Sequence, residues 1–468
     1  DTENNRLLFE MTAKYGTPYF SNYINSDMEP SDVRSMCCRL RLDLRELRKK
    51  TGGFFGSGES TGSVGVVTIN MPRIAYLAKD RNDFYRCLDR MMDISARSLK
   101  VKRSVISRLL DEGLYPYTKR YLGSFDNHFS TIGLIGMNEA GLNARWLGKD
   151  LSHKETQDFT KEVLNHMRER LSDYQELYGD LYNLEATPAE STTYRLAKHD
   201  KERYADIITA GHAGDTPYYT NSSHLPVDYT TDIFDALDVQ DELQTLYTSG
   251  TVFHAFLGEK LPDWKAAAQL VKTIAENYKL PYYTMSPTYS ICREHGYLSG
   301  EQKRCPKCGS VTEIYSRITG YYRPVQNWND GKLQEYANRT EYKMGNMVCA
   351  AHEKAAKGAA ASQTAAKKAA VRETVAAGRA GAQNVGKRSD RSKTMLFTTK
   401  TCPNCRLAKE YLKDVDYTIV DAEDNYDLAV QYGVMQAPTL VIVSGQSQQK
   451  YVNASNIRRY AEFLQTRI

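Results

Sequence analysis

A low-complexity segment towards the C-terminal end limits what this chain can fold into. Residues 350–393 hold 15 alanines among 44 residues, and 10 Lys or Arg stand there against 3 Asp or Glu. The segment lacks large apolar residues at helical spacing, so it cannot bury a core and is predicted to be a flexible or partly helical tether. A basic tail that binds RNA or phosphates is the alternative. The sequence therefore predicts a separate folding unit on each side of the tether.

The charge balance argues against a basic body that binds nucleic acid. The chain carries a net charge of +5, but the tether alone has an excess of 7 positive charges, which leaves about −2 for the rest. Nucleic-acid-binding proteins carry their positive charge on a folded face. At 468 residues the chain is long enough for two or three domains with a large core.

Nothing in the sequence predicts export or a membrane span. No run approaches the roughly 18 apolar residues that a membrane helix needs. Residues 1–6 are not a basic region followed by an apolar run, as a signal peptide would require. The nine cysteines are unevenly spaced, which suits metal binding and redox chemistry in a reducing compartment. We therefore expect a cytoplasmic protein with no membrane partner.

The part before the tether is predicted to be an α/β body. Apolar residues at intervals of three and four predict helices over residues 80–97, 154–178 and 264–278. Residues 64–71 form a short apolar run rich in β-branched side chains, which predicts a buried strand. The apolar stripes of these segments are assigned to the core.

The unit after the tether carries a redox motif. A predicted strand from Met395 is followed by Cys402 and Cys405 at a strand-to-helix junction, and far downstream by Pro438. A thiolate at a helix N-terminus has a lowered pKa and is a good nucleophile. Cys402 is therefore predicted to attack and Cys405 to resolve. The spacing also occurs in zinc sites, but a single pair in this unit favours redox chemistry.

A second cysteine motif predicts a metal site. Cys292 and His295 form one pair and Cys305 and Cys308 form another, which supplies four soft ligands on two short turns for a tetrahedral Zn²⁺ ion. A redox-active dithiol at Cys305 and Cys308 and an independent nucleic-acid-binding zinc ribbon are the alternatives. The ribbon is weakened because another motif follows almost at once, and the metal would hold that motif in place.

That next motif is a glycine within residues 315–323. An α carbon between an amide nitrogen and a carbonyl delocalises an unpaired electron, and Gly320 has no side chain to obstruct a hydrogen-abstracting partner. Gly320 is therefore a candidate radical store. Glycine before two aromatic residues is also common in ordinary turns.

Two further segments have polar or reactive side chains. Cys37 and Cys38 are adjacent and precede an arginine and the glycine-rich residues 52–58; adjacent cysteines are also common as small buried residues. Residues 183–192 run from a predicted strand end into a predicted helix, where hydroxyls and backbone amides bind phosphates or simply cap the helix. The candidate phosphate-binding residues there are Thr187, Pro188, Ser191 and Thr192. Glu59 and Glu190 have no assigned role, and His212, His224 and His254 are interpreted as structural.

Taken together, the motif around Gly320, the zinc motif before it and the Cys38-Arg39 pair resemble class III (anaerobic, glycyl radical) ribonucleoside-triphosphate reductases, in the C-terminal part of the catalytic subunit. The final unit resembles a glutaredoxin, in which the proline that matches Pro438 is cis. The resemblance implies an α/β fold, the second half of a ten-stranded barrel with a zinc module, plus a small thioredoxin fold. The implied domains are a half barrel with a cysteine finger loop, the zinc module with the glycyl loop, the tether and the glutaredoxin-like domain, over residues 1–285, 286–346, 347–393 and 394–468.

The resemblance also implies roles and partners. Gly320 would hold the radical and Cys38, with Cys37 as the alternative, would form the thiyl radical; the segment at Thr187 lies where substrate phosphates bind. The implied partners are a radical S-adenosylmethionine activase carrying a 4Fe-4S cluster, a ribonucleotide substrate, nucleotide effectors, a second copy of the chain, and thioredoxin reductase or glutathione for the glutaredoxin unit. The fused unit points to Cys402 and Cys405 as the electron source in place of formate.

Such a reductase has several hundred further residues before the finger loop, so the resemblance implies a fragment, a split or spliced product, or a half that needs a partner chain. A half barrel exposes strand edges and apolar surface, and we expect it to be inactive alone. The rival interpretations are another glycyl radical enzyme, a zinc-ribbon binding protein with a redox tail, and a stand-alone disulfide reductase.

Overall fold

The computed structural model of the chain describes residues 2–26, 33–36, 39–41, 61–258, 260–343 and most of 393–461. The chain divides into two compact units, Asp1–Lys367 and Lys368–Ile468. The division falls within the predicted tether, whose residues lie outside the described part up to residue 392.

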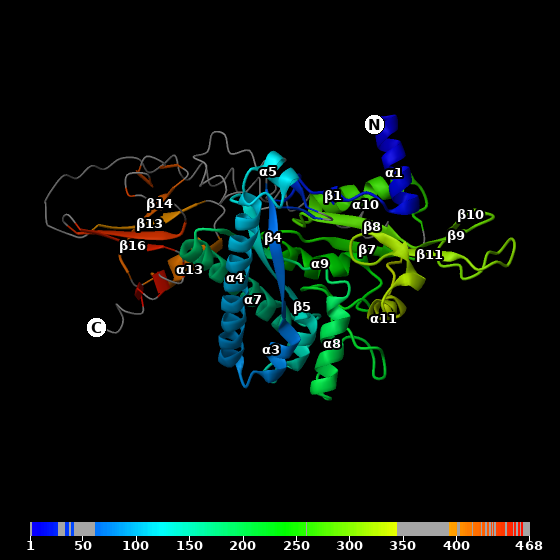
Figure 1. Cartoon of the computed structure of the whole chain (residues 1–468), viewed down its shortest axis with the longest axis horizontal. Coiled ribbons are helices and arrows are strands. Elements are labelled where there is room, and N and C mark those ends of the chain that lie inside the picture. Colours follow the sequence, from blue (N-terminus) through cyan, green and yellow to red (C-terminus); the bar gives the residue numbers. More distant parts are fainter. Residues whose placement is uncertain are drawn as a thin grey trace, which may run out of the picture. The chain divides into compact units, whose positions relative to one another are not determined.

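A parallel three-stranded sheet is the first framework of the larger unit. Its strands follow the order β4-β5-β6, and their bounds are Gly62–Asn70, His128–Ile135 and Leu181–Glu185. One face packs against the long helices α4 (Arg81–Asp111) and α7 (Lys154–Tyr178), which also contact each other (Figure 1). Ile132, Leu134 and Leu184 fill this interface and are fully buried.

The helix and strand predictions for this region are confirmed. α4 begins one residue after its N-cap Asp80, whose side chain accepts a hydrogen bond from the Asp83 amide at 2.9 Å. It runs to Asp111, well beyond the predicted end at residue 97. β4 covers nearly all of the predicted strand over residues 64–71.

Strand β4 is an edge strand, because β5 is its one neighbour in the described sheets. Val66 on β4 is 47% exposed, and α4 also leaves apolar side chains in solvent, among them Ile94, Val101 and Val105. The predicted half barrel requires such exposure. The described strands by themselves do not close a barrel.

A second sheet continues the framework. Its order is β1-β8-β7, with β7 and β8 parallel and β1 antiparallel to β8; the bounds are Phe20–Ser21, Tyr282–Pro287 and Phe253–Leu257. Two backbone hydrogen bonds join it to the first sheet, from the Ser249 amide to the Leu184 carbonyl at 2.8 Å and from the Ala186 amide to the Gly250 carbonyl at 3.0 Å. Its apolar face packs against α1 (Glu3–Tyr15), α9 (Ile233–Gln244) and α10 (Trp264–Asn277).

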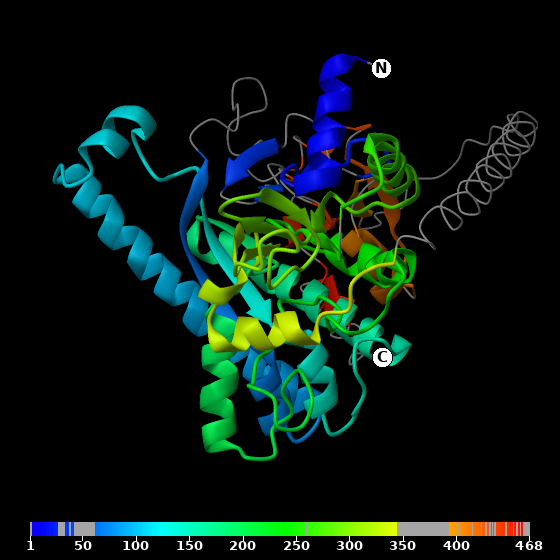
Figure 2. The same cartoon turned by 90° about the vertical axis from the view of Figure 1, so that its right-hand side faces the viewer.

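A four-stranded antiparallel sheet follows directly. Its order is β10-β9-β11-β12, and the bounds are Gly296–Ser299, Tyr289–Cys292, Glu313–Arg317 and Tyr322–Pro324. Only Thr288 separates β8 from β9, and the domain boundary expected between residues 285 and 286 falls inside β8. This sheet is therefore continuous with the body. Helix α11 (Asp330–Asn338) follows it and lies against α8 (Thr192–Arg203) (Figure 2).

Short elements complete the larger unit, and they are β2 (Val33–Met36), β3 (Arg39–Arg41), α3 (Met71–Leu77), α5 (Pro116–Leu122), α6 (Met137–Asn143) and the 3-10 turn η2 (Val325–Asn327). β2 and β3 pair antiparallel, with Met36 opposite Arg39. In the part of the chain that the structure describes, no helix is both long and apolar enough to cross a membrane.

The smaller unit has one mixed sheet in the order β14-β13-β15-β16. The central β13 pairs parallel with β14 and antiparallel with β15. The bounds of the strands are Lys393–Thr398, Thr418–Asp421, Thr439–Ser444 and Ser447–Val452, and helix α13 (Pro403–Tyr411) follows β13. Leu396 and Leu440 of the sheet pack against Ala408 and Leu412, so a strand-then-helix unit forms as predicted.

Candidate functional site

Gly320 lies in the tight connection between β11 and β12. These strands pair with Arg317 opposite Tyr322, and the Ile318 amide donates to the Tyr321 carbonyl at 3.1 Å across the loop. Gly320 itself is buried. The predicted radical residue is therefore enclosed by protein.

The carbonyl of Gly320 accepts hydrogen bonds from two side chains. The Tyr19 hydroxyl donates to it, and Arg317 Nη1 donates to it at 2.9 Å. Arg317 Nη1 also donates to the Tyr19 hydroxyl at 2.6 Å, which closes a triangle of polar groups on this one oxygen.

Arg317 is buried, at 2% exposure, and every one of its N–H groups has an acceptor. Besides Tyr19 and Gly320, its acceptors are the Gly16 carbonyl at 2.5 Å, Ser286 Oγ at 3.2 Å and Thr284 Oγ1 at 3.5 Å. The guanidinium carbon lies 4.5 Å from the ring centroid of Tyr19 and 4.7 Å from that of Tyr322. In the described ranges no carboxylate lies within 4 Å of Arg317, so no described acidic side chain pairs with its positive charge.

Gly16 gives this arrangement its N-terminal anchor. It ends α1 in the left-handed region with φ +62°, and an added Cβ would collide with the carbonyl of Met285 and the ring of Pro287. Only glycine fits both conditions. The segment after α1 therefore passes close enough for the Gly16 carbonyl and the Tyr19 hydroxyl to reach Arg317.

A cavity of about 100 Å³ adjoins the glycine loop. Ile318 and Thr319, the residues two and one before Gly320, form part of its wall. Thr187 and Pro188 line it too, together with polar side chains that include Thr220, Asn221, His224, Gln240 and His254. Concave sites with a few convergent polar groups are where small ligands bind.

Two polar atoms in the cavity wall, Asn221 Oδ1 and His254 Nδ1, have no hydrogen-bond partner among the residues that the structure describes. Burial, followed by the positive charge of Arg317, holds the pKa of His254 well below its usual range. Burial also lowers the pKa of His224 to about 4. Both imidazoles are therefore neutral at pH 7, and the cavity offers uncharged acceptors to a ligand.

The loop that carries Asn221 is strained. Ser222 has φ +48°, a conformation that non-glycine residues rarely adopt. The loop is held in place by buried Glu139, which accepts hydrogen bonds from the Thr220 amide at 3.0 Å and the Thr220 hydroxyl at 2.7 Å. Strain of this kind concentrates at binding sites. The three histidines interpreted as structural therefore have different surroundings. His224 and His254 line the cavity, and His212 is exposed.

The four candidate phosphate-binding residues do not stay together. Thr187 and Pro188 line the cavity, whereas Ser191 and Thr192 are not part of its wall. Ser191 is the N-cap of α8 but its side chain makes no capping hydrogen bond. Glu190, which had no assigned role, accepts a hydrogen bond from the Tyr321 hydroxyl at 2.8 Å and lies 3.6 Å from Arg323 Nη1. Glu190 therefore connects the segment that begins at Thr187 to the glycine loop and to β12.

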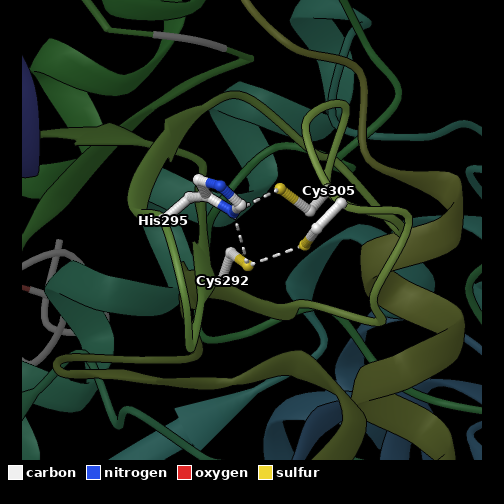
Figure 3. Close-up of side chains that lie close together, drawn as sticks. Cys292, His295 and Cys305 are labelled. Carbon is white, nitrogen blue, oxygen red and sulfur yellow. Dashed lines mark hydrogen bonds between the residues drawn. The ribbon is translucent and has the colours of Figure 1, made fainter.

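The predicted metal ligands come together in one cluster. Cys292, His295, Cys305 and Cys308 place their ligand atoms within 4.8 Å of one another. His295 Nδ1 lies 3.8 Å from Cys292 Sγ and 3.6 Å from Cys305 Sγ, and Cys292 Sγ lies 3.7 Å from Cys308 Sγ. Figure 3 shows the side chains of Cys292, His295 and Cys305 pointing toward one another. A tetrahedron with metal–sulfur bonds of about 2.3 Å has edges of about 3.8 Å. The donor set and its spacing therefore fit a tetrahedral Zn²⁺ ion.

The electrostatics of the cluster also suit a metal. Hydrogen bonds from Ser310 lower the pKa of the Cys308 thiol to about 6, which favours the thiolate that binds metals. Cys292 ends β9, and β9 pairs with β11, the strand that leads to the glycine loop. A metal ion here would hold one neighbour of that strand.

Some of the remaining residues considered above lie outside the part of the chain that the structure describes. These are Cys37, Cys38, Glu59 and Cys402. Cys405 is buried in the first turn of α13 and is disulfide-bonded. The Ala437–Pro438 peptide bond is cis, as the resemblance implied.

Comparison with known proteins gives one consistent family. A family model described as anaerobic ribonucleoside-triphosphate reductase matches residues 1–342. Two curated proteins of that name are similar in sequence: the protein of Haemophilus influenzae is 26% identical over 324 residues, covering 62% of this chain and 45% of that protein, and the protein of Enterobacteria phage T4 is 25% identical over 335 residues, covering 67% and 50%. The chain thus spans about half the length of the curated relatives it matches.

Solved structures agree in fold. A structure of an anaerobic ribonucleotide reductase superposes with a TM-score of 0.58 at 23% identity, covering 73% of this chain and 52% of the other. The anaerobic ribonucleotide reductase of Thermotoga maritima, solved in complex with dATP and CTP, gives a TM-score of 0.55 at 23% identity, covering 71% and 52%.

Proposed function

Because this chain belongs to the anaerobic ribonucleoside-triphosphate reductase family, we propose that it forms the radical-bearing half of an enzyme that reduces ribonucleotides to 2′-deoxyribonucleotides. The observation that carries the proposal is the burial of Gly320 in a loop whose residues Ile318 and Thr319 form part of the cavity wall. A stored radical and a bound nucleotide would thus be neighbours. The match over residues 1–342 decides against the other glycyl radical enzymes as the parent family.

In this proposal Gly320 loses a hydrogen atom to an activase that uses S-adenosylmethionine and a 4Fe-4S cluster. Cys38, or Cys37, then gives its hydrogen atom to Gly320, and the thiyl radical takes the 3′ hydrogen of the ribose. Water leaves from C2′, and two electrons with two protons complete the product. Such intermediates need a closed pocket from which water and oxygen are excluded. The chain would work as a homodimer.

The cysteines at 292, 305 and 308 and His295 would hold a structural Zn²⁺ ion, which supplies a fixed crosslink and no redox chemistry. Cys292 lies at the end of β9, and Cys305 and Cys308 lie in the turn before β11. Their role is to hold the strands from which the Gly320 loop extends.

The test of the proposed reductase activity is an anaerobic assay with activase and each ribonucleoside triphosphate, in which deoxyribonucleotide formation is measured.

We assign the substrate to the cavity lined by Thr187, and a pair of variants tests this. Thr187→Val removes the hydroxyl of a residue that lines the cavity, so the nucleotide Kd is expected to rise about three- to tenfold, the worth of one hydrogen bond. Thr192→Val, five residues on and outside the wall, should leave the Kd unchanged. Calorimetric titration with ribonucleoside triphosphates measures both. An equal rise in the nucleotide Kd in both variants would place the phosphates along the α8 N-terminus instead.

We further assign the electron supply to the glutaredoxin-like unit. Oxidation of the Cys402 and Cys405 dithiol to a disulfide releases the two electrons and two protons that the product needs, and thioredoxin reductase or glutathione would restore the dithiol. Cys405 is disulfide-bonded, so its sulfur is in an oxidised state. A tethered donor acts at an effective concentration near millimolar.

Cys402→Ser should lower steady-state turnover driven by the thiol system about a hundredfold, the advantage that tethering provides. The matched control is Cys87→Ser, which removes a free thiol on α4 and should keep full turnover. Product formation per chain is the measurement. Full activity of Cys402→Ser with formate as the reductant would refute this electron source and leave the reductase assignment intact.

A further inference from the structure

We infer that Arg317 and Tyr19 form a polarising clamp on the carbonyl of Gly320, and that this clamp stabilises the glycyl radical electronically. The inference rests on the proposed radical at Gly320 and concerns what sets its lifetime.

The two donors to the Gly320 carbonyl come from distant parts of the sequence. The Tyr19 hydroxyl and Arg317 Nη1 both donate to the Gly320 oxygen, and Nη1 also donates to Tyr19. Tyr19 is 301 residues from Gly320 in sequence, so this contact is not a by-product of local turn geometry. Two donors converge on one carbonyl of a buried residue.

Arg317 places a positive charge in this buried site. A buried cation without a paired anion is costly, and its retention calls for an explanation. Arg317 has carbonyl and hydroxyl oxygens as acceptors and two tyrosine rings within 5 Å of its guanidinium carbon, but no carboxylate among the described residues within 4 Å. Its positive charge is therefore left to act on the acceptor oxygens, and the Gly320 oxygen at 2.9 Å is among the nearest.

A radical at Gly320 changes the charge on the Gly320 carbonyl oxygen. When the Cα–H bond is broken, the unpaired electron is shared between the amide nitrogen, which gives electron density, and the carbonyl, which accepts it. One resonance form places negative charge on the carbonyl oxygen. Donors that are fixed in advance where charge develops stabilise that form without reorganisation, and a cationic donor does so more strongly than a neutral one. The clamp thus favours the radical over the parent glycine.

The surrounding contacts keep the clamp rigid. Tyr19 stacks on Tyr282 with ring centroids 5.1 Å apart, and the Tyr322 ring centroid lies 4.7 Å from the guanidinium carbon of Arg317. Gly16 and Ser286 fix the remaining guanidinium nitrogens. A donor that cannot rotate away retains its hydrogen bond throughout the lifetime of the radical.

The test compares Tyr19→Phe with Tyr322→Phe in the activated, anaerobically isolated complex. Both variants keep an aromatic ring on Arg317, but only Tyr19→Phe removes a hydroxyl from the Gly320 carbonyl, since the Tyr322 hydroxyl donates to the Pro287 carbonyl at 3.0 Å. The readouts are the exchangeable-proton couplings of the glycyl signal in H₂O and D₂O, by electron-nuclear double resonance, and the decay rate of the signal.

The parent chain and Tyr322→Phe should show two sets of exchangeable couplings, from Tyr19 O–H and Arg317 N–H. Tyr19→Phe should lose one set and its radical should decay about three- to tenfold faster, as expected for the loss of one hydrogen bond. Unchanged couplings and decay in Tyr19→Phe, with a normal doublet in the parent, would overturn the clamp and leave the proposed function standing. Absence of a doublet at Gly320 in the parent would overturn both.

Discussion

Replacing Gly320 with alanine is expected to abolish the glycyl doublet in electron paramagnetic resonance and to lower ribonucleotide reduction by about four orders of magnitude or more, the loss typical of removing a residue that carries the chemistry. Gly320 is buried in the loop between β11 and β12, and its carbonyl is held by Arg317 and Tyr19. A methyl group on Cα would obstruct abstraction of the remaining hydrogen and the planar geometry that the radical needs.

The experiment uses activase, S-adenosylmethionine and a reductant under anaerobic conditions. Gly65→Ala is the matched control, because Gly65 lies in β4, away from the glycine loop, and an added Cβ there would meet only the flexible end of Lys102. It should keep the doublet. Air should cleave the activated parent chain next to Gly320 into two fragments and leave Gly320→Ala intact. A doublet that persists in Gly320→Ala would place the radical elsewhere.

Removing the metal cluster is the second change with a large expected effect. Cys305→Ser, or extraction of the metal by a chelator, should lower the unfolding free energy of the larger unit by several kcal/mol, because structural zinc contributes ~10 kcal/mol or more of apparent binding energy in small zinc domains. The consequence extends beyond stability. β9 ends at Cys292 and pairs with β11, so loss of the metal should also loosen the strand that leads to Gly320.

Three measurements separate these effects: bound zinc per chain, the thermal unfolding midpoint and the yield of glycyl radical. Lys307→Ala is the control within the same turn, since Lys307 is exposed and is not a ligand. It should retain one zinc per chain and the parent midpoint. Normal radical yield in zinc-free Cys305→Ser would show that the cluster does not support the glycine loop.

Local patterns in the sequence were sufficient to predict much of this molecule. The periodicity of apolar residues located α4, α7 and α10, and the spacing of Cys292, His295, Cys305 and Cys308 correctly predicted that these four side chains come together. Each of these features depends on residues close to one another in the chain, or on one chemical requirement that all four ligands share.

Long-range contacts were not predictable in the same way. Nothing local marks Tyr19 as a neighbour of Gly320, because the contact depends on Gly16 turning the chain after α1 against β8. His224 and His254 lack metal-ligand spacing and were interpreted as structural, yet the fold brings both into the cavity wall. The signal that was available was the polar run from Thr220 to His224, whose strained Ser222 is visible only in the structure.

The contact between the two ends of the larger unit has a consequence for biosynthesis. Arg317 and Gly320 leave the ribosome about 300 residues after Gly16 and Tyr19, so a contact of such long sequence separation forms late in folding. A nascent or truncated chain has the Tyr19 hydroxyl without its acceptor. An activase that recognises the closed glycine loop would therefore act only on completed chains, and oxygen-sensitive radicals would not be generated on unfinished ones.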